Sequence, residues 1–116
     1  SALDLLKLAK DKTIGSSLVG IMRGSEFIQC DTEEQQSFFD TLSKFPSPLT
    51  IDYLDQLLSE KNLMRSKKVS QRQELAVRCL SNMTSPDAKP MLEKCVKRWF
   101  LPAGVKSAAK EAIKRK

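Results

Sequence analysis

The stretch from residue 38 to residue 58, FFDTLSKFPSPLTIDYLDQLL, constrains the fold more than any other part of the chain. It holds four of the seven aromatic residues, and its apolar residues recur at the helical period on both sides of a proline corner at 45–48. The pattern predicts one helix before the corner and a second helix, capped by Thr50, after it. Two helices cannot bury both apolar faces alone, so further helices must cover them.

The rest of the chain supplies those helices. Apolar stripes with the helical period predict helices at about 2–9, 16–22, 32–44, 50–61, 91–99 and 105–113. A further helix ends at residue 83 and begins at either residue 66 or residue 70. No run of alternating β-branched residues predicts a strand. We therefore expect an all-α, compact single-domain bundle of six to seven short helices. Because QELAVRCLSNM at 73–83 is typical of a HEAT or armadillo helix, that kind of packing is one form the bundle can take.

Local signals suggest where several helices begin and end. Gly15 is placed to end the first helix, and Thr32 with Gln35 has the spacing of a capping box. The segment 26–30 is equally compatible with an extended connector and a helical turn. Pro90 either begins the sixth helix or distorts its first turn.

The expected core combines the apolar positions of these stripes. It contains Phe38, Phe39, Leu42, Ile51, Leu54, Leu57, Leu75, Leu80, Leu92, Val96 and Trp99. Trp99 has a second interpretation as an anchor that faces a partner, because Trp beside Lys and Arg is a favoured composition at binding hot spots. We expect residues 1–104 to form the bundle and residues 105–116 to form a basic amphipathic helix, which either docks on the core or continues beyond it.

The composition excludes several classes of function. The chain has no histidine, which removes the commonest general base and metal ligand. Its three cysteines are far apart in sequence and are expected to be reduced core thiols, in keeping with an intracellular compartment. No stretch is long and apolar enough to span a membrane, and no phosphate-binding glycine motif is present. We expect a chain that is not an enzyme, has no cofactor, metal or small-molecule substrate, and is a part of something longer.

The charge is unevenly distributed along the chain. Residues 1–58 carry five basic and nine acidic side chains, whereas residues 59–116 carry fifteen basic and five acidic ones. The densest basic cluster falls between the fourth and fifth predicted helices, where loops of helical domains commonly bind partners. The predicted partner-binding residues are Lys61, Leu63, Met64, Arg65, Lys67, Lys68 and Arg72.

Two families share features with this chain. The stretch 38–58 and MLEKCVKRW at 91–99 resemble the N-terminal domain of the elongation factor TFIIS and the integrase-binding domain of chromatin adaptors. The family's Ile-Gly-Lys turn is absent near 62–70, and the predicted helix at 70–83 is additional. The overlapping stretch SFFDTLSKFPSPLTIDYLDQL at 37–57 also resembles the C-terminal helical domain of certain zinc aminopeptidases, whose catalytic motif would lie in a domain outside this chain.

The first resemblance implies a nuclear module that binds short acidic-hydrophobic protein segments of transcription or chromatin factors. The basic charge allows RNA or DNA as an alternative partner. The second resemblance implies an accessory helical domain of a larger enzyme.

Overall fold

The computed structural model describes residues 13–61 and 66–115, and every regular element within them is a helix, which confirms the predicted all-α bundle. The first helix covers residues 13–22. The helices that follow are α2 (Ser25–Gln29), α3 (Thr32–Leu42), α4 (Pro48–Ser59), α5 (Lys67–Asn82), α6 (Ala88–Lys97) and α7 (Ala103–Arg115). The segment 26–30, for which the sequence left two interpretations, therefore forms the short helix α2. The helix predicted at 2–9 lies outside the described residues.

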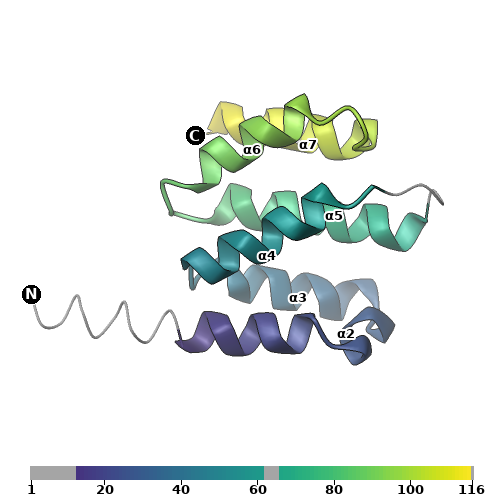
Figure 1. Cartoon of the computed structure of the whole chain (residues 1–116), viewed down its shortest axis with the longest axis vertical. Helices are drawn as coiled ribbons and strands as arrows, with labels where there is room; N and C mark the ends of the chain where they lie inside the picture. The colour runs from purple at the N-terminus through teal and green to yellow at the C-terminus, as the bar shows by residue number, and fades with distance from the viewer. Residues whose placement is uncertain (1–12, 62–65, 116) are drawn as a thin grey trace, which may run out of the picture.

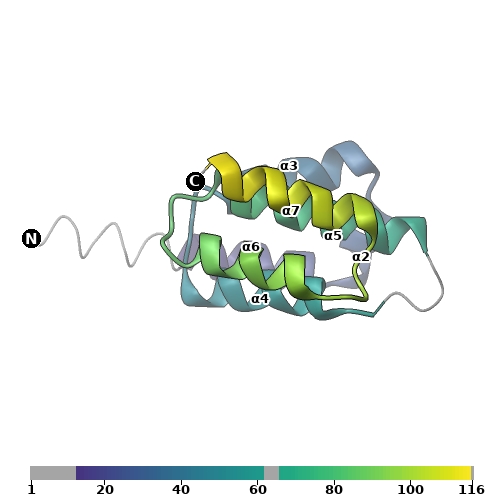
Figure 2. The same cartoon turned by 90° about the horizontal axis from the view of Figure 1, so that it is seen from above.

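The helices form two layers (Figures 1 and 2). One layer contains α3, α5 and α7, and the other contains the first helix, α4 and α6 (Figure 2). Contacts join α3 to α5 and α5 to α7 within the first layer, and they join α4 to α5 and α6 to α7 between the layers. Successive antiparallel helix pairs therefore stack on one another.

The core runs through the interface between the layers. Of the predicted core residues, Phe39, Leu42, Leu54, Leu75, Leu80 and Leu92 are buried. Another four, Phe38, Ile51, Leu57 and Val96, are partly buried and pack against the core. Trp99, in contrast, is 78% exposed, so its prediction as a core residue is wrong. Two of the three cysteines, Cys79 and Cys95, are buried as expected, whereas Cys30 is only half-buried.

The sequence predicts that Gly15 ends a helix, but in the structure Gly15 lies inside the first helix. A Cβ at this position would lie 3.1 Å from the backbone oxygen of Phe45 and 3.1 Å from Thr50 Oγ1. The glycine therefore lets the first helix approach the proline corner closely. Its lack of a side chain serves packing between helices and not a turn.

The helices on either side of the corner begin at caps other than the predicted ones. Asp31 caps α3, because its carboxylate accepts a hydrogen bond of 2.8 Å from the Glu34 amide. Ser47 caps α4 by accepting from the Thr50 amide at 3.2 Å, and Pro48 occupies the first helical turn. The predicted capping roles of Thr32 and Thr50 are therefore wrong, and Thr50 is instead buried inside the corner.

Two buried glutamines donate hydrogen bonds to the last backbone oxygens of the helix that precedes each of them. Gln35 Nε2 on α3 donates to the backbone oxygens of Phe27 and Cys30 at the end of α2, at 3.2 and 3.1 Å. Gln73 Nε2 on α5 donates to the backbone oxygens of Leu57 and Glu60 at the end of α4, at 3.2 and 3.0 Å. Because the last carbonyls of a helix have no partner within the helix, each amide supplies a missing donor.

The last two helices close the stack. Pro90 lies in the first turn of α6, where a missing amide hydrogen costs no helical hydrogen bond. The α7 stripe of Val105, Ala109 and Ala112 is buried, and α7 contacts both α5 and α6. Of the two outcomes left open for the last helix, the structure shows docking on the core.

Candidate interaction surface

On one side of the stack, where several helices begin or end, segments that are far apart in the sequence come together. The C-terminal end of α4, the first turn of α5 and the turn from α6 to α7 all lie there (Figures 1 and 2). Arg98 Nη2 in the turn donates to Asp55 Oδ1 on α4 at 2.7 Å, and this ion pair is partly buried. Leu101, two residues past Trp99, is buried in the core. The turn is therefore held at two points.

Between these two points the turn exposes Trp99 to solvent, while Phe100 is half-buried and packs against the core. The rings of Trp99 and Phe100 meet edge to face, with centroids 5.9 Å apart and planes at 88°. Lys61 Nζ, just beyond the end of α4, lies 5.9 Å from each ring centroid, which is within the range of cation–π attraction. We call Trp99 and Phe100 the aromatic turn.

The exposure of Trp99 has a local cause. The apolar stripe of α6 predicts that position 99 faces the core, but α6 ends at Lys97. Beyond the end of a helix the 3.6-residue period no longer sets the direction of a side chain. Leu101 enters the core instead, and Trp99 points outward.

The residues of the predicted basic cluster do not all lie at the same place on the surface. Lys61 lies beside the aromatic turn, while Lys67 and Lys68 are exposed in the first turn of α5. Arg72 is half-buried, and its Nε donates to the Lys68 backbone oxygen at 3.4 Å. The remaining predicted residues, Leu63, Met64 and Arg65, lie outside the described residues.

Sequence reasoning missed Phe100, the Asp55–Arg98 ion pair and the capping role of Gln73. A signal for the aromatic turn does exist in the sequence. Trp99-Phe100 directly follows the Lys97-Arg98 end of α6 and precedes Leu-Pro-Ala-Gly, so both rings fall between two helices. No comparable signal identifies Gln73, because its partners are backbone atoms of another helix.

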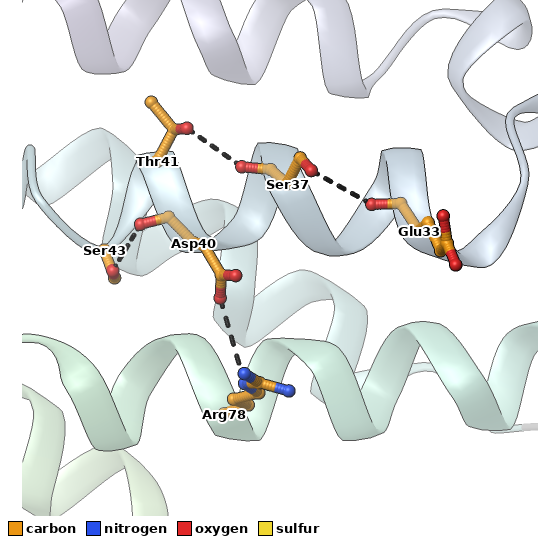
Figure 3. A network of polar contacts seen from close by, with 6 residues as sticks. All are labelled: Glu33, Ser37, Asp40, Thr41, Ser43 and Arg78. Atoms are coloured by element: carbon orange, nitrogen blue, oxygen red, sulfur yellow. Dashed lines mark hydrogen bonds and ion pairs between the residues drawn. The ribbon is translucent and has the colours of Figure 1, made fainter.

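A second polar surface lies where α3 meets α5 (Figure 3). Arg78 Nε on α5 lies 3.8 Å from Asp40 Oδ1 on α3, and both side chains are substantially exposed. Serine and threonine hydroxyls of α3 are bonded to the backbone of their own helix, as Ser37 is to Glu33 at 3.1 Å. This surface continues into a groove of about 340 Å³ between α5 and α7, lined by Glu74, Arg78, Glu111 and Arg115 together with small residues. Its charges are of both signs, so the groove does not favour one class of ion.

Two of the three thiols, those of Cys79 and Cys95, are buried. Burial raises the pKa of Cys79 to about 12 and that of Cys95 to about 11, so both thiols stay protonated at neutral pH and are poor nucleophiles. Burial also raises the pKa of Tyr53 to about 12. Over residues 13–61 and 66–115, no three cysteines or carboxylates come together as a metal site would require. Nor does any helix in these ranges have the length and apolar character needed to cross a membrane.

Comparisons with protein-family models, with curated proteins and with solved structures found no match. The resemblances to the TFIIS N-terminal domain and to the aminopeptidase helical domain therefore stay predictions.

Proposed function

We propose that this chain is a non-enzymatic interaction module that binds a short acidic-hydrophobic peptide at the aromatic turn. One observation carries the proposal: Trp99 is 78% exposed and lies beside Lys61, on the side of the stack where the basic first turn of α5 also lies (Figure 2). A solvent-exposed Trp with a neighbouring cation is the typical composition of a binding hot spot.

The surroundings of the turn support this interpretation. The Arg98–Asp55 ion pair and the buried Leu101 hold the turn in place before a ligand arrives, which reduces the entropic cost of binding. A hydrophobic side chain of the peptide would pack on the rings of Trp99 and Phe100. Carboxylates on either side of it would meet Lys61 and, further along, Lys67 and Lys68.

The non-enzymatic character is supported by the absence of histidine and by the protonated state of the buried thiols. A transcription or chromatin factor as the partner, and a nuclear location, rest on the resemblance to the TFIIS family alone.

A binding titration tests the proposal. The probe is a labelled synthetic peptide of about 12 residues in which Asp and Glu surround one Phe and one Leu, followed by fluorescence anisotropy. We expect Trp99→Ala to weaken binding by roughly 30-fold or more, because truncating a hot-spot aromatic costs about 2 kcal/mol or more. The matched control is Leu49→Ala, at the other end of α4, where a large apolar side chain is 37% exposed. It should bind like the unmodified protein.

The charge contribution is tested in the same assay. Lys61→Ala should weaken binding only about two- to five-fold, because a charge at the rim of an interface contributes about 1 kcal/mol or less. Lys44→Ala, an exposed lysine after α3, should have no effect. The proposal would be refuted if the Trp99→Ala variant bound the peptide as tightly as the unmodified protein does. It would also be refuted if Leu49→Ala weakened binding as much as Trp99→Ala does.

A further inference from the structure

The positive charge of the chain is concentrated in its last helix pair. Residues 88–116 carry nine basic and two acidic side chains, net +7, whereas residues 1–87 carry eleven basic and twelve acidic ones, net −1. The pair α6 and α7 lies at one end of the stack (Figure 1). The last helix pair therefore carries a larger net charge than the segment 61–72, between α4 and α5 and at the start of α5, which carries five basic and no acidic side chains.

Four exposed lysines and one half-buried lysine, Lys106, lie on this pair, and we call the five the lysine face. They are Lys94, Lys97, Lys106, Lys110 and Lys114. On α7 the three lysines are four residues apart, so successive Cα atoms rise by about 6 Å along the helix. The other side of α7, with Ala108, Glu111 and Arg115, faces the groove next to α5. The lysine row therefore runs along the side of α7 turned away from that groove.

Helix stability alone does not explain this row. Lys94 and Lys97 lie in the last turn of α6, and Lys114 lies in the last turn of α7, where the helix dipole favours cations. Lys106 lies near the start of α7, where the dipole disfavours them, and the first turn of α7 contains no acidic residue to compensate. The ion pairs described join Arg78 to Asp40 and Arg98 to Asp55. Within residues 13–61 and 66–115, no carboxylate is paired with a lysine of the face.

The lysine face offers charge without apolar anchors. The large hydrophobic side chains exposed among the described residues are Ile21, Ile28, Leu49 and Trp99; Trp99 lies in the turn between α6 and α7, and none of the four lies on α7 beside its row of lysines. The apolar stripe of α7 is buried against the bundle, so α7 cannot insert that stripe into a bilayer as a surface-bound amphipathic helix does. A ligand that suits this face carries closely and regularly spaced negative charges and needs no hydrophobic pocket. We propose that the lysine face binds the phosphate backbone of a nucleic acid.

This binding is independent of sequence and uses other side chains than the peptide site, which adjoins the face because Lys97 lies two residues before Trp99. Phosphate contacts by lysines carry no base information, and their strength depends on the release of counterions. If all five lysines contact phosphates, the logarithm of the affinity falls by about 4.5 for each tenfold rise in salt, at about 0.9 per contact. A peptide held mainly by Trp99 shows a much shallower dependence.

The experiment uses a labelled duplex DNA of about 20 base pairs and mixed sequence, because a duplex offers no unstacked base to the aromatic turn. The test variant is Lys110→Glu with Lys114→Glu, two exposed positions on α7. The control is Lys67→Glu with Lys68→Glu, two exposed positions in the first turn of α5 with the same change in net charge. Fluorescence anisotropy over a tenfold range of salt gives affinity and slope, and circular dichroism confirms that both variants fold.

We expect the α7 variant to bind the duplex roughly 60-fold or more weakly at moderate salt and to lose about 1.8 from the salt slope, which corresponds to two phosphate contacts. The α5 variant should lose less than about three-fold, and Trp99→Ala should bind the duplex normally. Equal losses in the two double variants would overturn the proposal, because net charge alone would then govern binding. If the unmodified protein did not bind the duplex, the proposal would be overturned as well, whether or not vesicles of anionic phospholipid bound the protein. The acidic-hydrophobic peptide should bind the α7 variant with unchanged affinity, so the two proposals can fail separately.

Discussion

Gln73 offers the sharpest test of how the interaction surface is held in place. Its side chain is only 1% exposed, and its Nε2 donates to the backbone oxygens of Leu57 and Glu60, which terminate α4 next to Lys61. Replacing it with methionine keeps the approximate volume and removes both hydrogen bonds. Each such bond contributes about 1 kcal/mol net to stability.

A second effect acts in the opposite direction. The Oε1 atom of Gln73 is buried and has no hydrogen-bond partner among the described residues, so methionine also removes a polar atom whose burial costs about 1 kcal/mol or more. The expected net loss for Gln73→Met is therefore about 1 kcal/mol of the free energy of unfolding. Gln73→Ala leaves a cavity in addition, and we expect a loss of about 3 kcal/mol.

Urea denaturation followed by circular dichroism measures both values. The matched control is Gln71→Met, an exposed glutamine on the same helix, which should change the free energy of unfolding by less than about 0.5 kcal/mol. Because Gln73 fixes the end of α4, the Gln73→Met protein should also bind the acidic-hydrophobic peptide more weakly than the Gln71→Met protein does. A Gln73→Met protein as stable as the unmodified chain, or more stable, would show that the two amide hydrogen bonds do not fix this helix end.

Two further predictions concern stability. Leu54→Ala, at a side chain that is 0% exposed, should cost about 2–5 kcal/mol in urea denaturation, whereas Leu49→Ala should cost less than about 0.5 kcal/mol; similar values for the two would mean that the core is wrongly placed. The contribution of the two buried thiols to stability should be fully present below pH 9 and should be lost as the pH rises toward 11–12. The reason is that the unfolded chain releases the thiol protons near pH 9, while burial in the folded protein raises the pKa of Cys79 to about 12 and that of Cys95 to about 11. The loss approaches about 1.4 kcal/mol per pH unit for each thiol, and a melting temperature that stays constant from about pH 8 to 10.5 would contradict it.

The sequence predicted the parts of the fold that depend on long-range periodicity. The stripes of α5 and α7 were recognisable because apolar residues recur over three or more helical turns. Helix ends were less predictable, because Ser47 and Thr50 have the same capping chemistry and only the backbone geometry decides between them. Gly15 illustrates a further limit, since a glycine at a helix end and a glycine at a close approach between helices look alike in a sequence.

The candidate surface was predictable only in part, for a similar reason. Local charge density identified Lys61, Lys67 and Lys68 as exposed basic residues, and the structure places all three on the surface. The pairing of Lys61 with Trp99 joins residues 38 positions apart in the chain, and no local pattern encodes it. The stacking of helix pairs creates that proximity, so it emerges only once the fold is known.

The outward position of Trp99 has a practical consequence for spectroscopy. It is the single tryptophan of the chain, and its indole is already largely surrounded by water in the folded protein. Its emission should therefore change little when the core melts, so tryptophan fluorescence is a poor reporter of unfolding in this protein. The same indole should become shielded when a ligand covers the aromatic turn, and its emission should then move to shorter wavelength without any label on either partner.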